Sequence, residues 1–594
     1  ELEDGEDFVP TKKGIVFGHH FTSIAGTGPI VGPAVAVMWG WLPALIWVLV
    51  GSIFIGAVHD FGALVVSMRN KGQTVGDIAG KVLNARVRIL FLFILVLALT
   101  LVLAIFGLVI AKVFGMYPAA ITPCLIQIPL AVIIGTFVHK KGANILIPSL
   151  IALAIMYASV VFGDVSFLQD FNNTLRDWPI MTWVSVLLVY SYVASVLPVW
   201  TLLQPRDYIN SLQLLSALGL VIVGLVVTGF IGGNPIVPGG ERQALEIVAP
   251  ALEESATGKG LPLMMPFLFI TIACGAVSGF HCLVSSGTSS KQLMCEKDSR
   301  FVGYGSMLTE GFLAVLVILA CVAGIGLGLT KGTGSEAVQY FGQDAWNAQY
   351  GSFAEAKGLP AKIGAFVGGA GNFLQTLGFS AGFATALMGV FVASFAATTL
   401  DSACRLQRYV VQELFGSCLD LKNRNKSDAE KLELRKKSWL TNKHFVTIFA
   451  IVIAFAMAAI PSKSGGTMGT GGLILWPLFG AINQLLAGLA FLVIVFWMRR
   501  RKMPCWFILL PAVLMLIFPG WAMAHQVFIQ GVGMEGSWIS EGRWLLVGMG
   551  IFTLLLEVWM IIEAVRSWKS SYGRDHELED NPEKLFPEGS DRCC

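Results

Sequence analysis

Uninterrupted runs of apolar residues, each about as long as a membrane-spanning helix, follow one another along most of the chain. A helix needs about 20 largely apolar residues to cross a bilayer. The runs do not alternate between apolar and polar positions, as the ten-residue strands of a transmembrane barrel do. The pattern therefore predicts an all-α polytopic membrane protein. The fourteen predicted spans are 14–38, 41–67, 87–111, 118–138, 145–163, 180–203, 209–230, 264–290, 305–329, 364–399, 444–460, 472–498, 504–523 and 544–565.

The tenth segment, 364–399, is longer than a simple span. It contains 36 residues and carries Gly-Gly-Ala-Gly near its N-terminal end. Two arrangements suit such a segment: one long tilted helix, or a re-entrant piece followed by a span. The sequence leaves both open.

Composition and charge agree with these spans and orient them. The 594 residues are 55% hydrophobic and only 13% charged, which excludes a set of water-soluble domains. When the N-terminus is placed in the cytoplasm, 32 of the 41 lysine and arginine residues fall in cytoplasmic segments, as the positive-inside rule requires. Membrane orientation thus explains where the basic residues are placed along the chain. We expect a lipid bilayer and no nucleic acid as a partner.

The span count divides the chain into two transmembrane halves. Residues 1–13 are predicted to form a cytoplasmic N-terminal segment, and 566–594 a cytoplasmic tail. Between them, 14–230 hold spans 1 to 7 and 264–565 hold spans 8 to 14. The outer connections 231–263 and 330–363 are the longest on their face, where we expect a plain amphipathic surface helix in preference to a lid over the site.

Polar residues interrupt the first span in GHHFTSIAGTG, residues 18–28, and a related stretch, GFHCLVSSGTSS, occupies residues 279–290 of the eighth span. Aligned on histidine, both follow the pattern GxHxxxxxGT, which pairs His20 with His281. Because seven crossings separate the two spans, they run in opposite directions. Antiparallel broken helices at corresponding positions are typical of inverted-repeat secondary transporters, whose substrate site lies between them.

We therefore predict that the two interrupted spans form the substrate site. Unwound backbone within a membrane is tolerated where it lines a polar cavity, and the N–H groups at a half-helix N-terminus bind anions. A small carboxylate is the substrate group that fits such a site. The predicted substrate-binding residues are His19, His20, Thr22, Ser23, Gly26, Thr27, His281, Ser285, Ser286, Gly287 and Thr288.

Each interrupted span is followed by a span that contains an acid, Asp60 in span 2 and Glu310 in span 9. Ionisable groups inside a membrane are costly and normally face a cavity or one another. Histidine exchanges protons near neutral pH, and a buried carboxyl group can do so too. The predicted proton-coupling residues are His20, His281, Asp60 and Glu310. We expect His59 at the membrane interface.

Other interpretations of these residues stay open. The histidines and acids could be structural, bonding to backbone groups that the interruptions free. They could also hold a metal, because His19, His20, His281, Asp60 and Cys282 are suitable ligands for zinc or iron. The protein would then be a metalloenzyme or a metal-dependent carrier.

A metabolite sensor with the same pocket is a further alternative. The sequence contains no P-loop pattern GxxxxGK[ST], so ATP hydrolysis by that route is not expected. We predict a transporter and not an enzyme.

Six segments of the chain together resemble the signature segments of the carbon starvation protein A family of bacterial inner-membrane transporters. They occur in order and cover nearly the whole chain. The segments are GHHFTSIAGTGPIVGPAVA, HDFGALVVSMRNKGQTVGDIAG, QPRDYINS, SGFHCLVSSGTSSKQL, TTLDSACRLQRYVVQEL and WPLFGAINQLLAGLA.

Members of this family are associated with uptake of peptides and of pyruvate, the latter by proton symport. The resemblance therefore implies an inner-membrane secondary transporter with inverted repeats, similar to the amino-acid/polyamine/organocation type. Family members usually carry a further hydrophobic helix ahead of the helix that contains GHHF. The resemblance therefore implies such a helix upstream of ELEDGEDFVP.

The matching segments also supply candidates for a gate or for a coupling-cation site. QPRDYINS places Arg206 and Asp207 at the inner end of span 6, where they could form a cytoplasmic gate or a structural ion pair at the membrane interface. The residues at the end of span 10 could bind a coupling cation, although we favour hydroxyl bonds to backbone carbonyls. These residues are Thr398, Thr399, Asp401 and Ser402.

Overall fold

The structure, a computed structural model, describes residues 3–573 with several gaps. The gaps are 143, 164, 236–239, 254–258, 333–336, 357, 424, 462–466, 470 and 532–535. The predicted cytoplasmic tail lies outside the described residues from position 574 onward.

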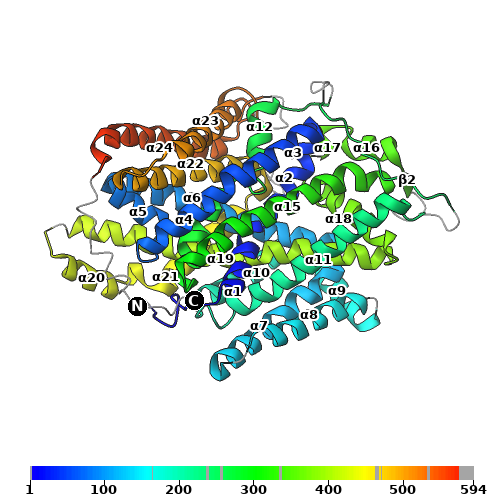
Figure 1. The fold of residues 1–594 in the computed structure, drawn as a ribbon, viewed down its shortest axis with the longest axis horizontal. Helices are drawn as coiled ribbons and strands as arrows, with labels where there is room; N and C mark the ends of the chain where they lie inside the picture. Colours follow the sequence, from blue (N-terminus) through cyan, green and yellow to red (C-terminus); the bar gives the residue numbers. More distant parts are fainter. Residues whose placement is uncertain are drawn as a thin grey trace.

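Long helices lie lengthwise beside one another and make up most of the described chain (Figure 1). The first half contains α1 Lys13–Ala25, α2 Gly28–Ala36, α3 Trp41–Val50, the π-helix η2 Gly51–Gly56, α4 Ala57–Arg69, α5 Val75–Val82, α6 Ala85–Met116, α7 Ile121–Lys141, α8 Leu146–Val161, α9 Ser166–Arg176, α10 Ile180–Val196 and α11 Leu203–Ile231.

The second half begins with a span made of short pieces and ends with three long helices. It contains α12 Met264–Thr271, α13 Gly279–Val284, the π-helix η4 Ser285–Ser289, α14 Ser290–Gln292, the π-helix η6 Arg300–Tyr304, α15 Gly305–Leu319, the π-helix η7 Ala320–Gly324, β1 Leu329–Lys331, β2 Val338–Tyr340, α16 Gly342–Tyr350, α17 Phe353–Ala356, α18 Leu359–Thr376, α19 Ala381–Lys422, α20 Asp428–Lys437, α21 Lys443–Ala458, α22 Trp476–Arg500, α23 Trp506–Phe528 and α24 Trp544–Trp568. Strands β1 and β2 pair antiparallel.

The helices account for all fourteen predicted spans. Nine described helices are long and apolar enough to cross a membrane, or up to eleven when each of two bent pairs counts as one span. The remaining predicted spans correspond to the shorter helices α10 and α21 and to the interrupted segment α12 to α14. The prediction of an all-α polytopic membrane protein is confirmed.

The first span is broken between α1 and α2, whose axes differ by 45°. Gly26 adopts φ 42° and ψ −154° at this point, a conformation that residues with side chains rarely take. A helix end leaves its last carbonyls unpaired. The hydroxyls of Thr398 and Thr399 on α19 lie 3.2 Å from two of them, those of Thr22 and Ser23, and share their protons with carbonyls of their own helix at 2.9 to 3.1 Å.

The eighth span is broken over residues 272–278, between α12 and α13. Asn483 of α22 holds the start of α13, because its side-chain oxygen accepts from the backbone N–H of Phe280 at 2.8 Å and its amide donates to the Ser278 hydroxyl at 2.9 Å. The two breaks lie against each other. A Cβ on Gly28 would be only 2.3 Å from the Cys274 sulfur, so the glycine permits this close approach.

The two broken spans pack antiparallel, as expected of an inverted repeat. The N-terminal half of the first, α1, contacts η4 and α13 in the C-terminal half of the second, while α2 contacts α12. The alignment on histidine is nevertheless wrong as a symmetry relation, because the break follows His20 but precedes His281. Gly287 and Thr288, which it equates with the first break, lie inside η4. Two glycine- and serine-rich segments can share a motif although tertiary packing breaks their helices at different positions. The motif alone therefore does not predict where the helix is broken.

The tenth predicted span consists of two helices, α18 and α19. Lys362 in the first turn of α18 lies over Trp476, the first residue of α22. At the other end of α18, the Gln375 carbonyl accepts from Asn234, just beyond the end of α11, at 2.7 Å. Both partners are at span ends on the predicted outer side. Both ends of α18 are therefore on that side, and α19 forms the span. The single long tilted helix is wrong, and a re-entrant course for α18 stays a prediction.

The outer helix α16 is an amphipathic surface helix, as expected. Gln343, Asp344 and Asn347 are exposed on one face, whereas Trp346 and Tyr350 on the other are each only 1% exposed. The Tyr350 hydroxyl donates to the Ala34 carbonyl of α2 at 2.7 Å. Burial of these two rings links the outer connection to the first broken span.

The N-terminal segment crosses the opposite, predicted cytoplasmic, face. The carboxylate of Asp7 is 2.7 Å from the guanidinium of Arg405 and 3.2 Å from that of Arg408, both on α19. Thr11 forms a parallel bridge with Leu293, just after α14. The segment therefore connects α19 to the inner end of the second broken span.

Replacement of Asp7 should remove a pH-dependent part of the stability. Burial alone would raise the pKa of Asp7, but the guanidinium groups of Arg408 and Arg405 outweigh it and lower the pKa from 3.8 to about 2. The stabilisation is therefore present above about pH 4 and is lost as the pH falls toward 2. We expect Asp7→Asn to reduce the free energy of unfolding at neutral pH by about 2 kcal/mol.

Thermal unfolding of the detergent-solubilised protein across this pH range checks the Asp7 prediction. Glu6→Gln is the matched control, because the Glu6 side chain is 58% exposed and exposed ion pairs contribute little. An Asp7→Asn deficit that is as large at pH 2 as at pH 7 would contradict the proposed charge interaction.

Gly279→Ala should destabilise the packing of α13 on α22. Its Cβ would lie 2.3 Å from the Asn483 carbonyl oxygen and 2.5 Å from the Ala487 nitrogen, both backbone atoms. Overpacking of this kind costs about 1–3 kcal/mol. Gly368→Ala on α18 is the control, since nothing lies within 4 Å of its Cβ. Equal melting temperatures for the two variants in detergent would rule out the close α13–α22 contact.

Candidate functional site

Eight of the ionisable side chains that are buried around the two breaks form one group, and none of the eight is more than 2% exposed. Helices α1, α4, α11, α13, α15 and α19 supply them. Charged groups in a membrane need partners or a polar ligand. We call this group the polar centre; its members are His19, His20, Asp60, Arg206, Asp207, His281, Glu310 and Asp401.

His19 connects α1 to α11 and to the second broken span. Its Nδ1 is 2.5 Å from the Asp207 carboxylate, and its Nε2 is 3.0 Å from the Thr288 hydroxyl. The hydroxyl of Thr288 donates to the Val284 carbonyl at 3.0 Å, which leaves its oxygen to accept from His19. If the Thr288 hydroxyl keeps this bond, both ring nitrogens of His19 face acceptors and both would have to carry a proton; if it turns to His19, the neutral imidazole satisfies both contacts.

His20 lies on the same helix and has a different environment. Its Nδ1 is 2.8 Å from the Ser289 hydroxyl of η4. Its Nε2 has no hydrogen-bond partner among the described residues, and the same holds for the hydroxyls of Thr27 and Ser285. These three predicted substrate-binding residues therefore carry polar atoms that remain available to a ligand.

His281 joins the two acids that follow the broken spans. Its Nδ1 is 3.0 Å from one oxygen of Asp60, whose other oxygen is 2.9 Å from Nδ1 of His59. Its Nε2 is 3.3 Å from Glu310. His59 is fully buried against Phe491, and the adjacent Asp60 gives it a polar partner. Its position at the membrane interface stays a prediction.

The predicted gate residues have separate partners. Arg206 forms an ion pair with Asp401 of α19, and Tyr190 donates to the same carboxylate at 2.8 Å, whereas Asp207 pairs with His19. The expectation of a mutual Arg206–Asp207 pair at the membrane interface is wrong, because adjacent helical residues do not face each other and both are buried. A gating role for them stays a prediction.

The other residues near Asp401 bond to the first broken span. Thr398 and Thr399 donate to backbone carbonyls, as described above, and the Ser402 hydroxyl is 2.9 Å from the Ser23 hydroxyl. These contacts agree with the hydroxyl bonding that we favoured. A coupling-cation site at this position stays a prediction.

Three of the predicted substrate-binding residues have structural contacts. Thr22 donates to the Gly18 carbonyl at 2.9 Å, and Ser286 to the Cys282 carbonyl at 2.7 Å. A Cβ on Gly287 would lie 2.2 Å from a leucine side chain of α19, so this glycine serves helix packing. A role of these three residues in substrate binding stays a prediction.

Two residues of the site, Ser289 and Cys274, were not predicted from the sequence. The ligand atoms of Cys274, His281 and Glu310 all lie within 4.8 Å of one another, a spacing that could hold a metal ion. Cys282 does not belong to this group, because its neighbour His281 projects from a different side of the helix. No sequence signal singled out Cys274, which lies seven positions before His281 in the unwound segment.

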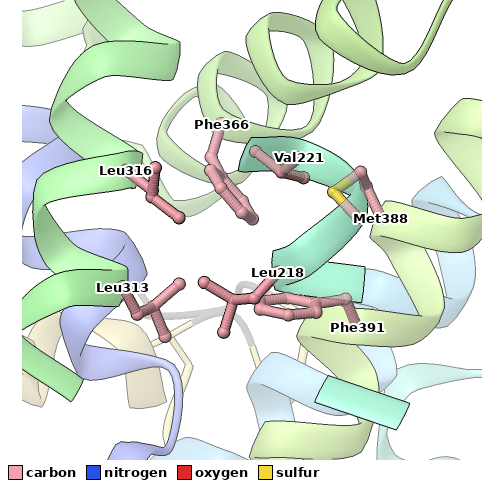
Figure 2. A pocket seen from close by; sticks show the side chains of 7 residues that line it. All are labelled: Leu218, Val221, Leu313, Leu316, Phe366, Met388 and Phe391. Atoms are coloured by element: carbon pink, nitrogen blue, oxygen red, sulfur yellow. The ribbon is translucent and has the colours of Figure 1, made fainter. Parts of the chain in front are cut away.

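Apolar side chains lie beyond the polar centre toward the predicted outer side. They surround a cavity of only ≈ 10 Å³ between α11, α15, α18 and α19 (Figure 2), about enough room for one water molecule. Leu313 in its wall is one turn beyond Glu310 on α15, and Phe366 comes from α18. This apolar layer and α18 separate the polar centre from the outer face in this region.

Known proteins resemble the chain over most of its length. The family model described as carbon starvation protein CstA matches residues 1–522. Peptide transporter CstA of Campylobacter jejuni is 32% identical, over 86% of this chain and 73% of that protein. The pyruvate/proton symporter BtsT of Escherichia coli is 30% identical, over 91% and 78%. Peptide transporter CstA of Bacillus subtilis is 30% identical, over 96% and 90%.

Solved structures match with low sequence identity. MhsT in complex with L-phenylalanine gives a TM-score of 0.46 at 10% identity, over 94% of this chain and all of that one. The Eremococcus coleocola manganese transporter gives 0.47 at 12% identity, over 95% and 99%. The family model and the sequence relatives are decisive: this multi-pass bacterial inner-membrane protein belongs to the carbon starvation protein CstA family.

Proposed function

We propose that the protein is a secondary active transporter that takes up small carboxylates or peptides together with protons. The observation that carries the proposal is the set of buried polar atoms without partners on the two broken spans. These atoms are His20 Nε2, Thr27 Oγ1 and Ser285 Oγ. Buried polar atoms are costly unless they are hydrogen-bonded. A polar ligand between the broken spans would satisfy them.

A carboxylate suits this group of atoms because imidazole and hydroxyl groups donate hydrogen bonds to it. The helix α2 begins at Gly28, directly after the first break, so the positive end of its dipole is at the same place. Pyruvate and peptides each carry a carboxylate. The two substrate classes in the names of the relatives thus share the group that these atoms would bind.

The proposed proton-binding group is the His19–Asp207 pair. With its additional proton, the pair donates to Thr288, whose hydroxyl bonds to Val284. Without that proton, Nε2 of His19 becomes an acceptor, and the Thr288 hydroxyl must turn toward it to restore the hydrogen bond. Protonation therefore changes the connection between α1 and η4, the inner halves of the two broken spans.

This connection offers a physical route for coupling. In an alternating-access transporter, one repeat moves against the other around a fixed site. A proton that strengthens or weakens the α1–η4 contact would bias this movement. The relative named as a pyruvate/proton symporter supports protons as the coupling ion. The predicted roles of His20, His281, Asp60 and Glu310 in proton transfer stay predictions.

Uptake into proteoliposomes tests proton coupling. Accumulation of radiolabelled pyruvate or of a dipeptide should rise when the outside is made acidic. Asp207→Asn should lose this gradient-driven accumulation but retain exchange of labelled for unlabelled substrate, because the proton-binding carboxylate is removed and the substrate site is not. Asp170→Asn, on exposed α9, is the matched control.

Two outcomes would contradict the coupling proposal. If the folded wild type accumulates neither substrate, or does so regardless of the gradient, proton symport of these substrates is wrong. If Asp207→Asn keeps the wild-type response to the gradient, the proton binds elsewhere.

His20→Ala tests the substrate site. Loss of a hydrogen bond to a charged substrate group costs about 1.5–3 kcal/mol, so we expect KM to rise roughly 10- to 100-fold while the protein still folds. His139→Ala is the control, since His139 is exposed and stacks on Trp200. An unchanged KM, measured by initial uptake rates, would exclude His20 from substrate binding. A collapse of folding would support a structural role.

A further inference from the structure

We propose that Cys274, His281 and Glu310 bind a divalent transition-metal ion, with zinc as the best match, at the break in the second broken span. The proposal goes beyond transport and does not depend on it. The sulfur, a ring nitrogen and a carboxylate oxygen lie within 4.8 Å of one another. Cys274 is 7% exposed and the other two side chains are fully buried.

The orientation of His281 is that of a metal ligand. Its Nδ1 is 3.0 Å from the Asp60 carboxylate, an acceptor that keeps the proton on Nδ1. The lone pair of a neutral imidazole is then on Nε2, the nitrogen that faces Glu310. A carboxylate behind a ligating histidine is a recurrent feature of zinc sites, where it fixes the tautomer and the direction of the ring.

Apart from His281, Glu310 has no polar partner within the described part of the chain. Neither of its carboxylate oxygens, nor Nε2 of His281, has a hydrogen-bond partner among the described residues. An imidazole lone pair 3.3 Å from a carboxylate is a contact between two acceptors. A cation or a proton between them is needed to make it favourable.

The spacing and the charges favour a metal ion. Tetrahedral ligands about 2.0–2.1 Å from zinc are separated from each other by about 3.3–3.4 Å, and His281 Nε2 and Glu310 are 3.3 Å apart. Asp60 and Glu310 bring two carboxylates to this buried region, which a divalent ion would balance. A proton shared by His281 and Glu310 would leave Cys274 without a role.

The Asn483 amide supports a thiolate at Cys274. It donates to the sulfur at 3.9 Å, and a hydrogen bond to a ligating sulfur supports it. In this structure the thiol donates to the Ser278 hydroxyl at 3.8 Å, and its proton would be released on metal binding. A set of one sulfur, one nitrogen and one carboxylate ligand selects zinc or a similar ion over magnesium or calcium, which prefer oxygen ligands. Three protein ligands leave one tetrahedral position for a further ligand.

Metal binding by the purified, chelator-treated protein in detergent tests the proposal. We expect one equivalent of Zn²⁺ per chain by elemental analysis after desalting, and an increase in melting temperature on zinc addition. Co²⁺ should replace it and give the absorption band of a cobalt–thiolate bond.

Variants identify the ligands. Cys274→Ser should abolish the cobalt–thiolate band, and Glu310→Gln should reduce bound zinc to well below one equivalent. Cys282→Ser is the matched control, because this buried cysteine is adjacent to His281 but lies outside the group. Asp60→Asn should weaken zinc binding by about 10- to 100-fold without removing the cobalt–thiolate band. If Cys274→Ser does not elute as a folded monodisperse protein, Glu310→Gln carries the test.

The outcomes separate metal binding from both proton transfer and transport. Absence of stoichiometric zinc in the wild type, or equal binding by the wild type and Glu310→Gln, would overturn the proposal and leave a proton between His281 and Glu310. A cobalt–thiolate band that disappears in Cys282→Ser and persists in Cys274→Ser would also overturn it. Zinc binding with these variant effects would support it even if neither pyruvate nor dipeptide were taken up.

Discussion

Hydrogen bonding of backbone and ionisable groups in a region without water is the constraint on which the rest of the structure depends. A membrane-spanning helix satisfies its own backbone, but a broken one does not. The breaks at Gly26 and at residues 272–278 free carbonyls and N–H groups at depth. The side chains of Thr398 and Thr399 on α19 and of Asn483 on α22 meet several of them. Polar residues on these two unbroken helices thus make the breaks possible.

The same constraint divides the polar centre into two groups. In one, Asp207 and Asp401 have cationic or proton-sharing partners, His19 and Arg206. In the other, His281 lies between Asp60 and Glu310, and only the contact to Asp60 is a satisfied hydrogen bond. His20 belongs to neither group and keeps one ring nitrogen without a partner among the described residues. The first group is suited to hold a proton, the second to hold a cation, and the free nitrogen of His20 to bind a substrate carboxylate.

Contacts on both the predicted cytoplasmic face and the predicted outer face enclose the polar centre. On the predicted cytoplasmic side, Asp7 connects the N-terminal segment to the arginines of α19. On the outer side, α18 forms part of the apolar layer shown in Figure 2, and Tyr350 of α16 is bonded to α2. Movement between outward and inward access would have to open one closure at a time. The ion pairs of Asp7 and the packing of Tyr350 are on the two sides where such opening would occur.

The sequence by itself determined the spans, the two interrupted helices and all eight members of the polar centre, and it predicts the orientation. Apolar length, lysine and arginine placement, and ionisable residues within apolar runs are local properties, and the bilayer gives each a direct physical meaning. Tertiary structure alone decided the partners. Adjacent residues such as Arg206 and Asp207 project from different sides of a helix, so their separate pairing with Asp401 and His19 depends on which helices pack there. For the same reason Cys274, and not the neighbouring Cys282, comes to lie beside His281 and Glu310.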